Sequence, residues 1–442
     1  MRTLFAGGVV FVGGRFCRAD LLMEETRVVA VDRGLDRSDV DRVVDCEGRV
    51  IAPTFIDLHT HLRYPGVDED DDPTSIARAA LVGGYGVIVA MANTQPPIDR
   101  VERWREANSL FATLPIEVVQ AATVTLGREG HRLVDFERLV DAGVEIFSDD
   151  GSGIQDSSVM RQALVASAEF GVLIAQHSED AALAAGGVVN DGVAADALGV
   201  ASIPEVAESV MVARDIELLK GIPGRLHLQH VSARESLNLF RQAKREGLRI
   251  SAEVTPHHLL LPDTRVLGGD TRFKVNPPLR SVPTQMALLQ GVLDGSFDAV
   301  ATDHAPHPDS RKRGSYREAA FGMVGISEAM PATWTALWRT IGSGERRKLG
   351  SDLASPEWIA LGRLLSCLTS GPAEVLGRSI RLAPQARADL VVIDPSAEPR
   401  EIPSRWYRSG NSPYRGEMLI GRVDDVFLAG RQVVDEGEVV DA

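Results

Sequence analysis

Asp57-Leu58-His59-Thr60-His61 follows the apolar run Val50-Ile51-Ala52 and the chain breaker Pro53. In an extended strand, residues two apart point to the same face, so His59 and His61 are expected to project together. Two imidazoles on one face form half of a transition-metal site. An isolated pair of this kind is more often simply hydrogen-bonded or solvent-exposed, so its meaning depends on the rest of the chain.

Four further stretches place a metal-ligand side chain at the expected end of a strand. They are residues 145–151 with Asp149 and Asp150, residues 172–177 with His177, residues 225–230 with His230, and residues 298–304 with Asp303. With His59 and His61 included, four of the chain's ten histidines therefore lie at expected strand ends. Four imidazoles together with two carboxylates suit a two-metal site with mixed nitrogen and oxygen ligands.

The middle of the chain alternates strand and helix patterns. We expect strands over residues 55–59, 86–92, 116–123, 144–148, 172–177, 226–230, 249–254 and 299–302. Helical patterns fall between them over residues 75–82, 101–110, 136–142, 158–170 and 203–219. This alternation predicts an α/β fold, a (β/α)8 TIM-type barrel, whose chemistry lies at the carboxyl ends of the strands. A doubly wound open sheet is the alternative, but it would gather the ligands in one crevice.

Both ends of the chain show short strand patterns separated by turn signals. We therefore expect residues 1–52 and 385–442 to form one composite β-sandwich domain, and residues 53–384 to form the barrel. Two unrelated β appendages are the alternative.

Composition limits the classes of partner. The chain has 442 residues, 44% of them hydrophobic, and a net charge of −15, which argues against nucleic acid or an anionic membrane as the main partner. Its three cysteines are unclustered, so a disulfide framework is not expected and a reducing cytoplasm fits. Residues 4–14 are apolar, but repeated glycines favour a pair of strands over a signal peptide. No stretch approaches the ~18 apolar residues of a membrane span.

The segment from Asp57 to Gly66 resembles the metal-binding signature of the amidohydrolase superfamily, and Arg63 with Pro65-Gly66 resembles the dihydroorotase family specifically. The similarity continues through residues 91–96, 147–151, 177–180, 230–232, 275–280, 302–307 and 321–322. These motifs follow the family's order, and the β-rich termini match its second domain. The resemblance implies a metal-dependent amidohydrolase barrel over residues 53–384.

The metal ligands implied by the resemblance are His59, His61, Asp150, His177, His230 and Asp303. Two Zn²⁺ ions per subunit are expected, although cobalt and manganese suit the same ligands. Many amidohydrolases bridge their metals with a carboxylated lysine, but this chain has no lysine before Lys220. Bacterial dihydroorotases of the similar type hold an aspartate there, and Asp150 occupies that position, with Asp149 expected in a turn. A mononuclear site on His59, His61 and Asp303 is the alternative.

The activity implied is reversible hydrolysis of (S)-dihydroorotate to N-carbamoyl-L-aspartate in de novo pyrimidine biosynthesis. Asp303 is expected to act as the general base. A substrate carboxylate needs a paired cation, and Arg63 can supply one with fork geometry. The family pattern implies substrate contacts from His61, Arg63, Asn93, Asn276, His307, Phe321 and Gly322.

Two other functions are considered. One is an allantoinase- or hydantoinase-type cyclic amidase, but a neutral ring would leave Arg63, Asn93 and His307 unpaired. The other is a non-catalytic dihydroorotase-like partner of aspartate carbamoyltransferase. Such a protein could have lost its metal ligands, but all six expected ligands are present in this chain. A homodimer and association with that transferase are expectations from the family alone.

Several residues receive a structural interpretation. His227 is expected to pack inside the barrel, and His257-His258, adjacent on an extended chain, are not expected to bind metal. The basic segment 308–317 is either a solvated loop or, as we favour, a mobile lid that attracts an anionic substrate. Residues 325–328 depart from the family's usual Gly-Leu-Glu-Thr, which predicts altered packing behind that loop.

Overall fold

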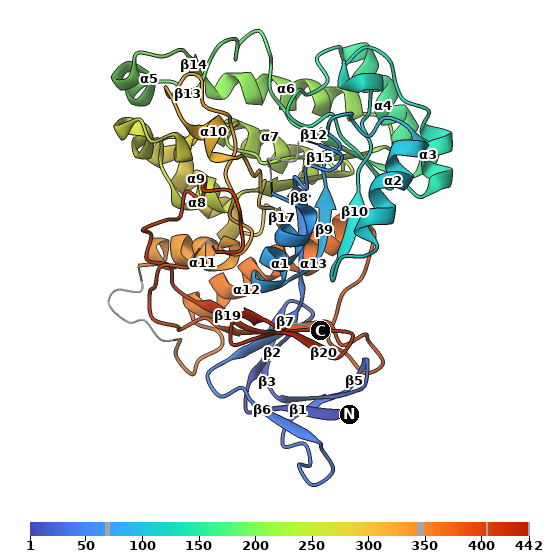
Figure 1. Ribbon diagram of the computed structural model, residues 1–442, viewed down its shortest axis with the longest axis vertical. Helices are drawn as coiled ribbons and strands as arrows, with labels where there is room; N and C mark the ends of the chain where they lie inside the picture. Colours follow the sequence, from blue (N-terminus) through green and yellow to red (C-terminus); the bar gives the residue numbers. More distant parts are fainter. Residues whose placement is uncertain (67–70, 343–348, 404, 441–442) are drawn as a thin grey trace.

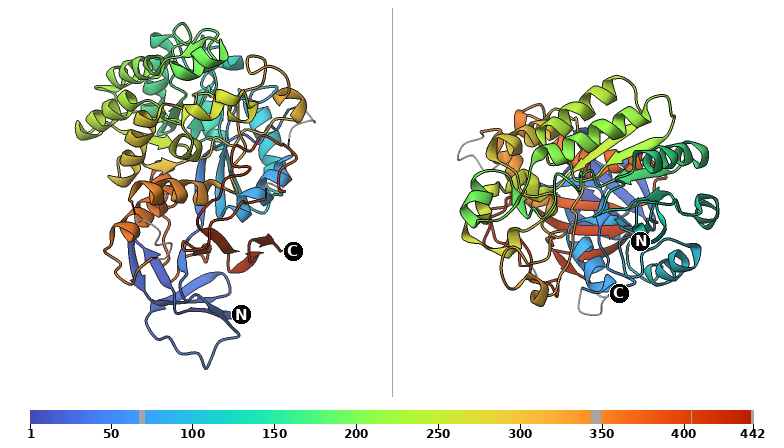
Figure 2. Two further views of the ribbon diagram at one scale, coloured as in Figure 1. Left: turned by 90° about the vertical axis from the view of Figure 1, so that its left-hand side faces the viewer. Right: turned by 90° about the horizontal axis from the view of Figure 1, so that it is seen from above.

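The computed structural model describes residues 1–66, 71–342, 349–403 and 405–440. A barrel of parallel strands surrounded by helices lies above a group of strands from both chain ends (Figure 1). Seen from above, the helices form a ring around the central strands (Figure 2).

In the described part of the chain, the barrel has eight strands in two arcs. One arc has the order β10-β9-β8 and the other β11-β12-β15-β16-β17. The strands are β8 (Phe55–Thr60), β9 (Tyr85–Ala90), β10 (Glu117–Gln120), β11 (Ile146–Phe147), β12 (Leu173–Gln176), β15 (Arg225–Leu228), β16 (Ile250–Val254) and β17 (Ala299–Val300). Parallel bridges join Ala122 to Phe147 and Thr60 to His304, and these bridges link the arcs. The prediction of a (β/α)8 barrel is confirmed, and all eight expected strands are present.

The helices are α1 (Pro73–Val82), α2 (Val101–Phe111), α3 (Phe136–Ala142), α4 (Ser157–Phe170), α5 (Val193–Leu198), α6 (Glu205–Leu219), α7 (Arg234–Arg245), α8 (Pro256–Leu260), α9 (Val282–Leu293), α10 (Asp309–Lys312), α11 (Ala329–Thr340), α12 (Pro356–Leu368) and α13 (Ser370–Val375). Sequence signals explain their ends. At α4, the Asp156 carboxylate accepts N–H bonds from the first turn, and Gly171 ends the helix at a positive φ of 73°. Within the described ranges, no helix combines the length and apolar character needed to cross a membrane.

The chain ends supply two further sheets. A four-stranded sheet has the order β5 (Arg27–Asp32), β4 (Asp20–Glu24), β1 (Arg2–Ala6) and β6 (Arg42–Asp45). A seven-stranded sheet has the order β21 (Glu438–Val439), β20 (Arg431–Asp435), β19 (Arg422–Leu428), β18 (Leu390–Asp394), β7 (Val50–Pro53), β2 (Val9–Val12) and β3 (Arg15–Arg18). The antiparallel pairing of β7 with β18 joins the two chain ends. Side chains of both sheets share one core, where Phe5 and Phe427 meet edge to face at 5.0 Å.

Between β18 and β19 the chain returns to the barrel. The Tyr407 hydroxyl accepts the Ser327 N–H at 2.8 Å and donates to the buried Glu328 carboxylate at 2.8 Å. Asn411 donates to the carbonyl of Ala305 at 3.0 Å. Part of the range 385–442 therefore packs on the barrel. Segment 325–328, which departs from the family pattern, forms hydrogen bonds with Tyr407 of this returning chain.

A buried carboxylate links the first barrel strand to the last. Asp57 accepts the N–H groups of His59 at 3.2 Å and Thr302 at 2.9 Å. It also accepts the hydroxyls of Thr60 at 2.8 Å and Thr302 at 2.5 Å. Because Thr302 follows β17, these bonds hold β8 and β17 together beneath the metal-ligand positions.

We expect Asp57→Ala to lower the free energy of unfolding by at least about 3 kcal/mol, because it leaves several buried donors without an acceptor. Urea unfolding followed by tryptophan fluorescence measures the change. The control is Asp36→Ala on an exposed loop, which should stay within about 0.5 kcal/mol of the parent. Equal unfolding midpoints for the two variants would show that Asp57 does not support barrel closure.

Candidate metal centre and active site

Two histidines from β8 and its end face one aspartate. His59 and His61 have ring centroids 5.2 Å apart, as expected for residues two apart on a strand. Asp303, after β17, places Oδ1 2.8 Å from His61 Nε2 and 3.5 Å from His59 Nε2. The ligand atoms of the three residues all lie within 4.8 Å of one another, and the three side chains are buried.

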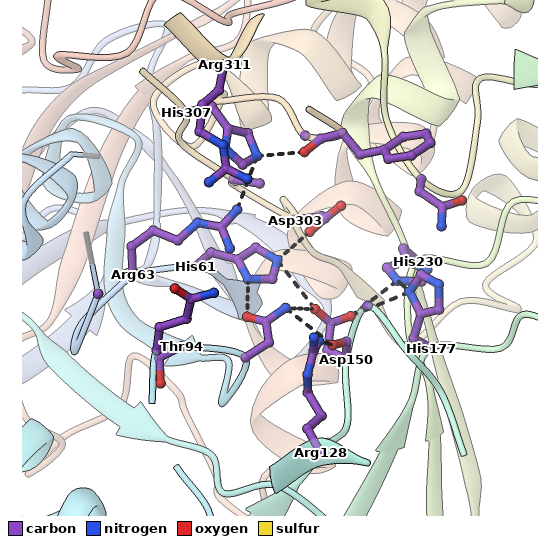
Figure 3. A pocket seen from close by; sticks show the side chains of 18 of the residues that line it. His61, Arg63, Thr94, Arg128, Asp150, His177, His230, Asp303, His307 and Arg311 are labelled. Carbon is purple, nitrogen blue, oxygen red and sulfur yellow. Dashed lines mark hydrogen bonds and ion pairs between the residues drawn. The ribbon is translucent and has the colours of Figure 1, made fainter. Parts of the chain in front are cut away.

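Asp150 lies at the centre of the cluster, as Figure 3 shows. Its Oδ1 is 3.4 Å from His59 Nε2, and its Oδ2 is 3.6 Å from His61 Nε2. The same Oδ1 is 3.6 Å from both His177 Nδ1 and His230 Nε2. One carboxylate thus faces all four histidines, which is the position a bridging ligand needs.

Hydrogen bonds on the far sides of the rings direct the histidine lone pairs inward. His59 Nδ1 lies 2.8 Å from Glu253 Oε1, and His61 Nδ1 lies 3.0 Å from Asn93 Oδ1. Each Nδ1 can carry the proton and donate it, which leaves Nε2 free to bind a metal. The buried Nε2 of His59 has no hydrogen-bond partner in the described chain. This unpartnered atom fits a metal-ligand role.

Glu253 is a functional residue that the sequence reasoning missed. It is fully buried on β16, where Oε1 faces His59 and Oε2 lies 3.0 Å from His227 Nε2. Burial would raise the pKa of this carboxyl, but His227 and His59 hold it down at about 2. A carboxylate on the inward side of an apolar strand is the signal that could have revealed it.

The charges at this centre depend on one another. Burial opposes ionisation of Asp150 and Asp303, yet the neighbouring histidines hold both pKa values well below the usual range. Burial would also lower the pKa of His59, but Asp150 and Asp303 raise it well above its ordinary value. Buried carboxylates need a nearby positive charge, and divalent cations between the Asp and His ligands would supply it.

A cavity of about 410 Å³ opens above the cluster. Its lining includes all of the expected ligands and substrate contacts except His59, namely His61, Arg63, Asn93, Asp150, His177, His230, Asn276, Asp303, His307, Phe321 and Gly322. Arg128 and Arg311 also line it. Arg311 belongs to the basic segment 308–317, whereas Arg128 was not predicted. In Figure 3, Arg128 lies beside Asp150, and Arg311 lies beyond His307.

Asn93 lines the cavity and also contacts two of the expected metal ligands. Its amide nitrogen donates to Asp150 Oδ2 at 2.9 Å, and its oxygen faces His61. Arg128 donates to the backbone carbonyl of Asp150, which also accepts from the Asn93 amide at 3.3 Å. Both side chains therefore orient the central aspartate.

At the opposite rim, Arg63 and His307 lie together. The Arg63 Nη2 atom is 3.4 Å from His307 Nε2, and that nitrogen lies 2.6 Å from the Phe321 carbonyl. Burial, with Arg63 second, lowers the pKa of His307 to about 2, so the ring is neutral and its Nε2–H donates to Phe321. Arg63 and Arg311 both bring positive charge to this side of the cavity.

Three of the site residues have an unusual backbone. Arg63, His230 and Asp303 have positive φ values of 56°, 33° and 46°. Non-glycine residues in this region carry strain that surrounding contacts must hold, and such positions concentrate at functional sites.

The remaining expectations have mixed outcomes. Asp149 turns away and accepts N–H bonds from Val124 and Thr125, as expected of a turn carboxylate. His227 is buried inside the barrel. His257 and His258 lie on the short helix α8, so the prediction of an extended backbone at these residues was wrong. The His258 ring contacts the backbone carbonyls of Pro277 and Pro278.

Comparison with known proteins identifies the family. A family model described as dihydro-orotase-like matches residues 48–236. The dihydroorotase of Geobacillus sp. (strain WCH70) is 37% identical over 95% of this chain and 95% of its own. The chain belongs to the dihydroorotase family. A Listeria monocytogenes serotype 4b (strain CLIP80459) dihydroorotase is also 37% identical, over 99% of this chain and all of its own.

Solved structures support the fold. The L-hydantoinase of Arthrobacter aurescens superposes with a TM-score of 0.83 at 22% identity, covering 99% of this chain and 97% of its own. The dihydropyrimidinase of Brevibacillus agri NCHU1002 gives 0.82 at 21% identity, covering 100% and 96%. At this identity the likeness concerns the fold alone.

We expect Glu253→Gln to weaken divalent-metal binding about 10- to 100-fold, because the amide keeps the shape but removes the charge behind His59. Equilibrium dialysis with Zn²⁺, read by elemental analysis, measures this without reference to turnover. The control Glu145→Gln, on an exposed side chain paired with Arg378, should leave affinity unchanged. Unaltered binding in Glu253→Gln would exclude the supporting role.

Proposed function

We propose that this chain catalyses the reversible hydrolysis of (S)-dihydroorotate to N-carbamoyl-L-aspartate in de novo pyrimidine biosynthesis. The observation that carries the proposal is the Asp150-centred histidine cluster, which opens into a cavity with Arg63 at its rim. Full-length similarity to dihydroorotases supports the same assignment.

The proposed centre holds two divalent ions, and the family resemblance favours zinc. His59, His61 and Asp303 would hold one, His177 and His230 the other, and Asp150 would bridge them. Such ions lower the pKa of a bound water and polarise a carbonyl oxygen. The residues fit this task because their lone pairs converge on a small volume around Asp150.

Asp303 is the proposed proton carrier. The histidines keep its carboxylate ionised, so it can accept the proton of the attacking water. The water oxygen then bonds to the ring amide carbon, the carbon–nitrogen bond breaks, and Asp303 returns the proton to the departing nitrogen. The products are a ureido group and a new carboxylic acid, which becomes a carboxylate by releasing its proton to solvent. The reverse sequence takes that proton up and closes the ring.

The cavity rim is proposed to orient the substrate. Arg63 would pair with the ring carboxylate, with His307 beside it. Asn276 would read the ring amide, since its buried Oδ1 has no hydrogen-bond partner in the described chain. Backbone groups of Phe321 and Gly322 line the same wall.

The hydantoinase-type alternative is disfavoured because a neutral ring has no carboxylate to pair with the Arg63 guanidinium that lines the cavity. The non-catalytic alternative is disfavoured because the whole ligand set converges. Homodimer formation, association with aspartate carbamoyltransferase and a cytoplasmic location remain predictions.

We expect Asp303→Asn to lower kcat for dihydroorotate by at least about 10²–10⁴-fold, because the amide cannot accept the proton. Metal content and thermal unfolding are measured on the same samples, since Asp303 also faces a metal position. The control Asp294→Asn, on a helix end away from the cavity, should keep parental rates. Substantial residual turnover in Asp303→Asn would remove this residue as the base.

We expect Arg63→Met to lower kcat/KM for dihydroorotate by about 100-fold or more, mainly through KM, because the substrate carboxylate loses its charged partner. Slow hydrolysis of the neutral ring dihydrouracil, if present in the parent, serves as the internal control and should change little. An unchanged KM for dihydroorotate would show that the carboxylate is held elsewhere.

A further inference from the structure

Two buried lysines lie beside the cavity, in a chain that has only five. Lys274 and Lys312 are 1% and 6% exposed. Lys312 belongs to the basic segment that sequence reasoning assigned to a solvated loop or a mobile lid. The solvated interpretation is wrong for this side chain, because its ammonium points into the protein.

The Lys312 ammonium lies among three backbone carbonyls. Its Nζ is 3.2 Å from the Lys274 oxygen, 2.8 Å from the Ala320 oxygen and 2.9 Å from the Gly322 oxygen. An ammonium has three N–H donors, so this environment can satisfy all of them.

These carbonyls belong to two segments that form one wall of the cavity. Lys274 precedes Asn276 by two residues, while Gly322 and its neighbour Phe321 line the cavity directly. The Gly322 N–H also donates to the Lys274 carbonyl at 3.0 Å. Lys312 therefore ties the segment that carries Asn276 to the segment that carries Phe321 and Gly322.

Other buried donors hold the same segments. Lys274 Nζ donates to the Arg317 carbonyl at 2.8 Å and lies 4.5 Å from the centre of the Phe321 ring. From the returning C-terminal chain, Asn411 donates to the Gly322 carbonyl at 3.2 Å, so this oxygen is shared with Lys312. Burial, with Lys274 second, lowers the pKa of Lys312 to about 7. Burying such a group is costly, and a purely structural position could hold an apolar side chain instead.

We propose that Lys312 is a positioning residue for the substrate: its ammonium fixes the backbone of Phe321 and Gly322 against the Asn276 segment and so sets the shape of the cavity wall. This inference rests on the proposed function. His307 contacts the Phe321 carbonyl, so loosening this wall would also disturb the side of the cavity where Arg63 lies.

The test compares Lys312→Met, which keeps the length but removes the donors, with Lys220→Met on an exposed lysine as the control. Asn411→Ala is the second variant, because it removes the other donor to Gly322 and keeps the test available if Lys312→Met does not fold. Each metal-replete variant is assayed for kcat and KM with dihydroorotate. Hydrogen exchange of the backbone amides around Phe321 and Gly322 is measured by mass spectrometry.

The proposal predicts that Lys312→Met raises KM at least tenfold with kcat within threefold, that Asn411→Ala shifts KM in the same direction, and that the Gly322 region exchanges faster. A KM of Lys312→Met within twofold of the parent value would overturn the proposal. So would a tenfold or larger loss of kcat in this variant with KM unchanged. If the parent does not turn over dihydroorotate, the proposed function fails. In that case exchange alone decides the role of Lys312: unchanged exchange around Gly322 would reject it, and faster exchange would retain it.

Discussion

The architecture depends on concentrating buried negative charge at the carboxyl end of a barrel and balancing it with histidines. Asp150 and Asp303 face the histidine cluster directly, and Glu253 lies one imidazole further back. Desolvated carboxylates destabilise a fold unless positive charge is close. The strand ends meet this need by bringing ligands from distant parts of the chain to one point, and divalent ions would complete the balance. Strand β8 therefore links barrel closure to metal affinity. It carries Asp57, which bonds to Thr302, and His59, which is an expected metal ligand.

The set of metal ligands could be predicted because it follows from the geometry of single strands and of a parallel barrel. The alternation of side chains along β8 brings His59 and His61 together, and parallel strands bring their carboxyl ends to one rim. Glu253 and Lys312 were not predicted, because their meaning depends on partners distant in sequence. Glu253 is the one charged residue in the strand Ile250–Val254, and Lys312 lies in a basic run that is typical of a solvated loop. Neither local pattern indicates that the ionic group is buried against another segment.

Contacts between segments that are distant in sequence also give residues roles that local patterns do not predict. Asn93 was predicted to contact the substrate carboxylate, and its amide additionally orients Asp150 and His61. The chain returning from the terminal sheets contributes Tyr407 and Asn411 to the barrel, which a division by sequence pattern could not show. The wall of the cavity is therefore supported from outside the barrel as well as within it. Such support fixes catalytic geometry without contact to the reacting atoms.

The most direct test of the account is hydrolysis of L-dihydroorotate by metal-replete protein, with dihydrouracil and allantoin assayed in parallel. The account predicts rapid turnover of dihydroorotate, and much slower or no turnover of the neutral rings, because only the former carries the carboxylate that Arg63 is proposed to hold. Turnover of a neutral ring alone would contradict the role given to Arg63 and place the activity among hydantoinases. No turnover of any ring with metal bound would contradict the catalytic assignment itself.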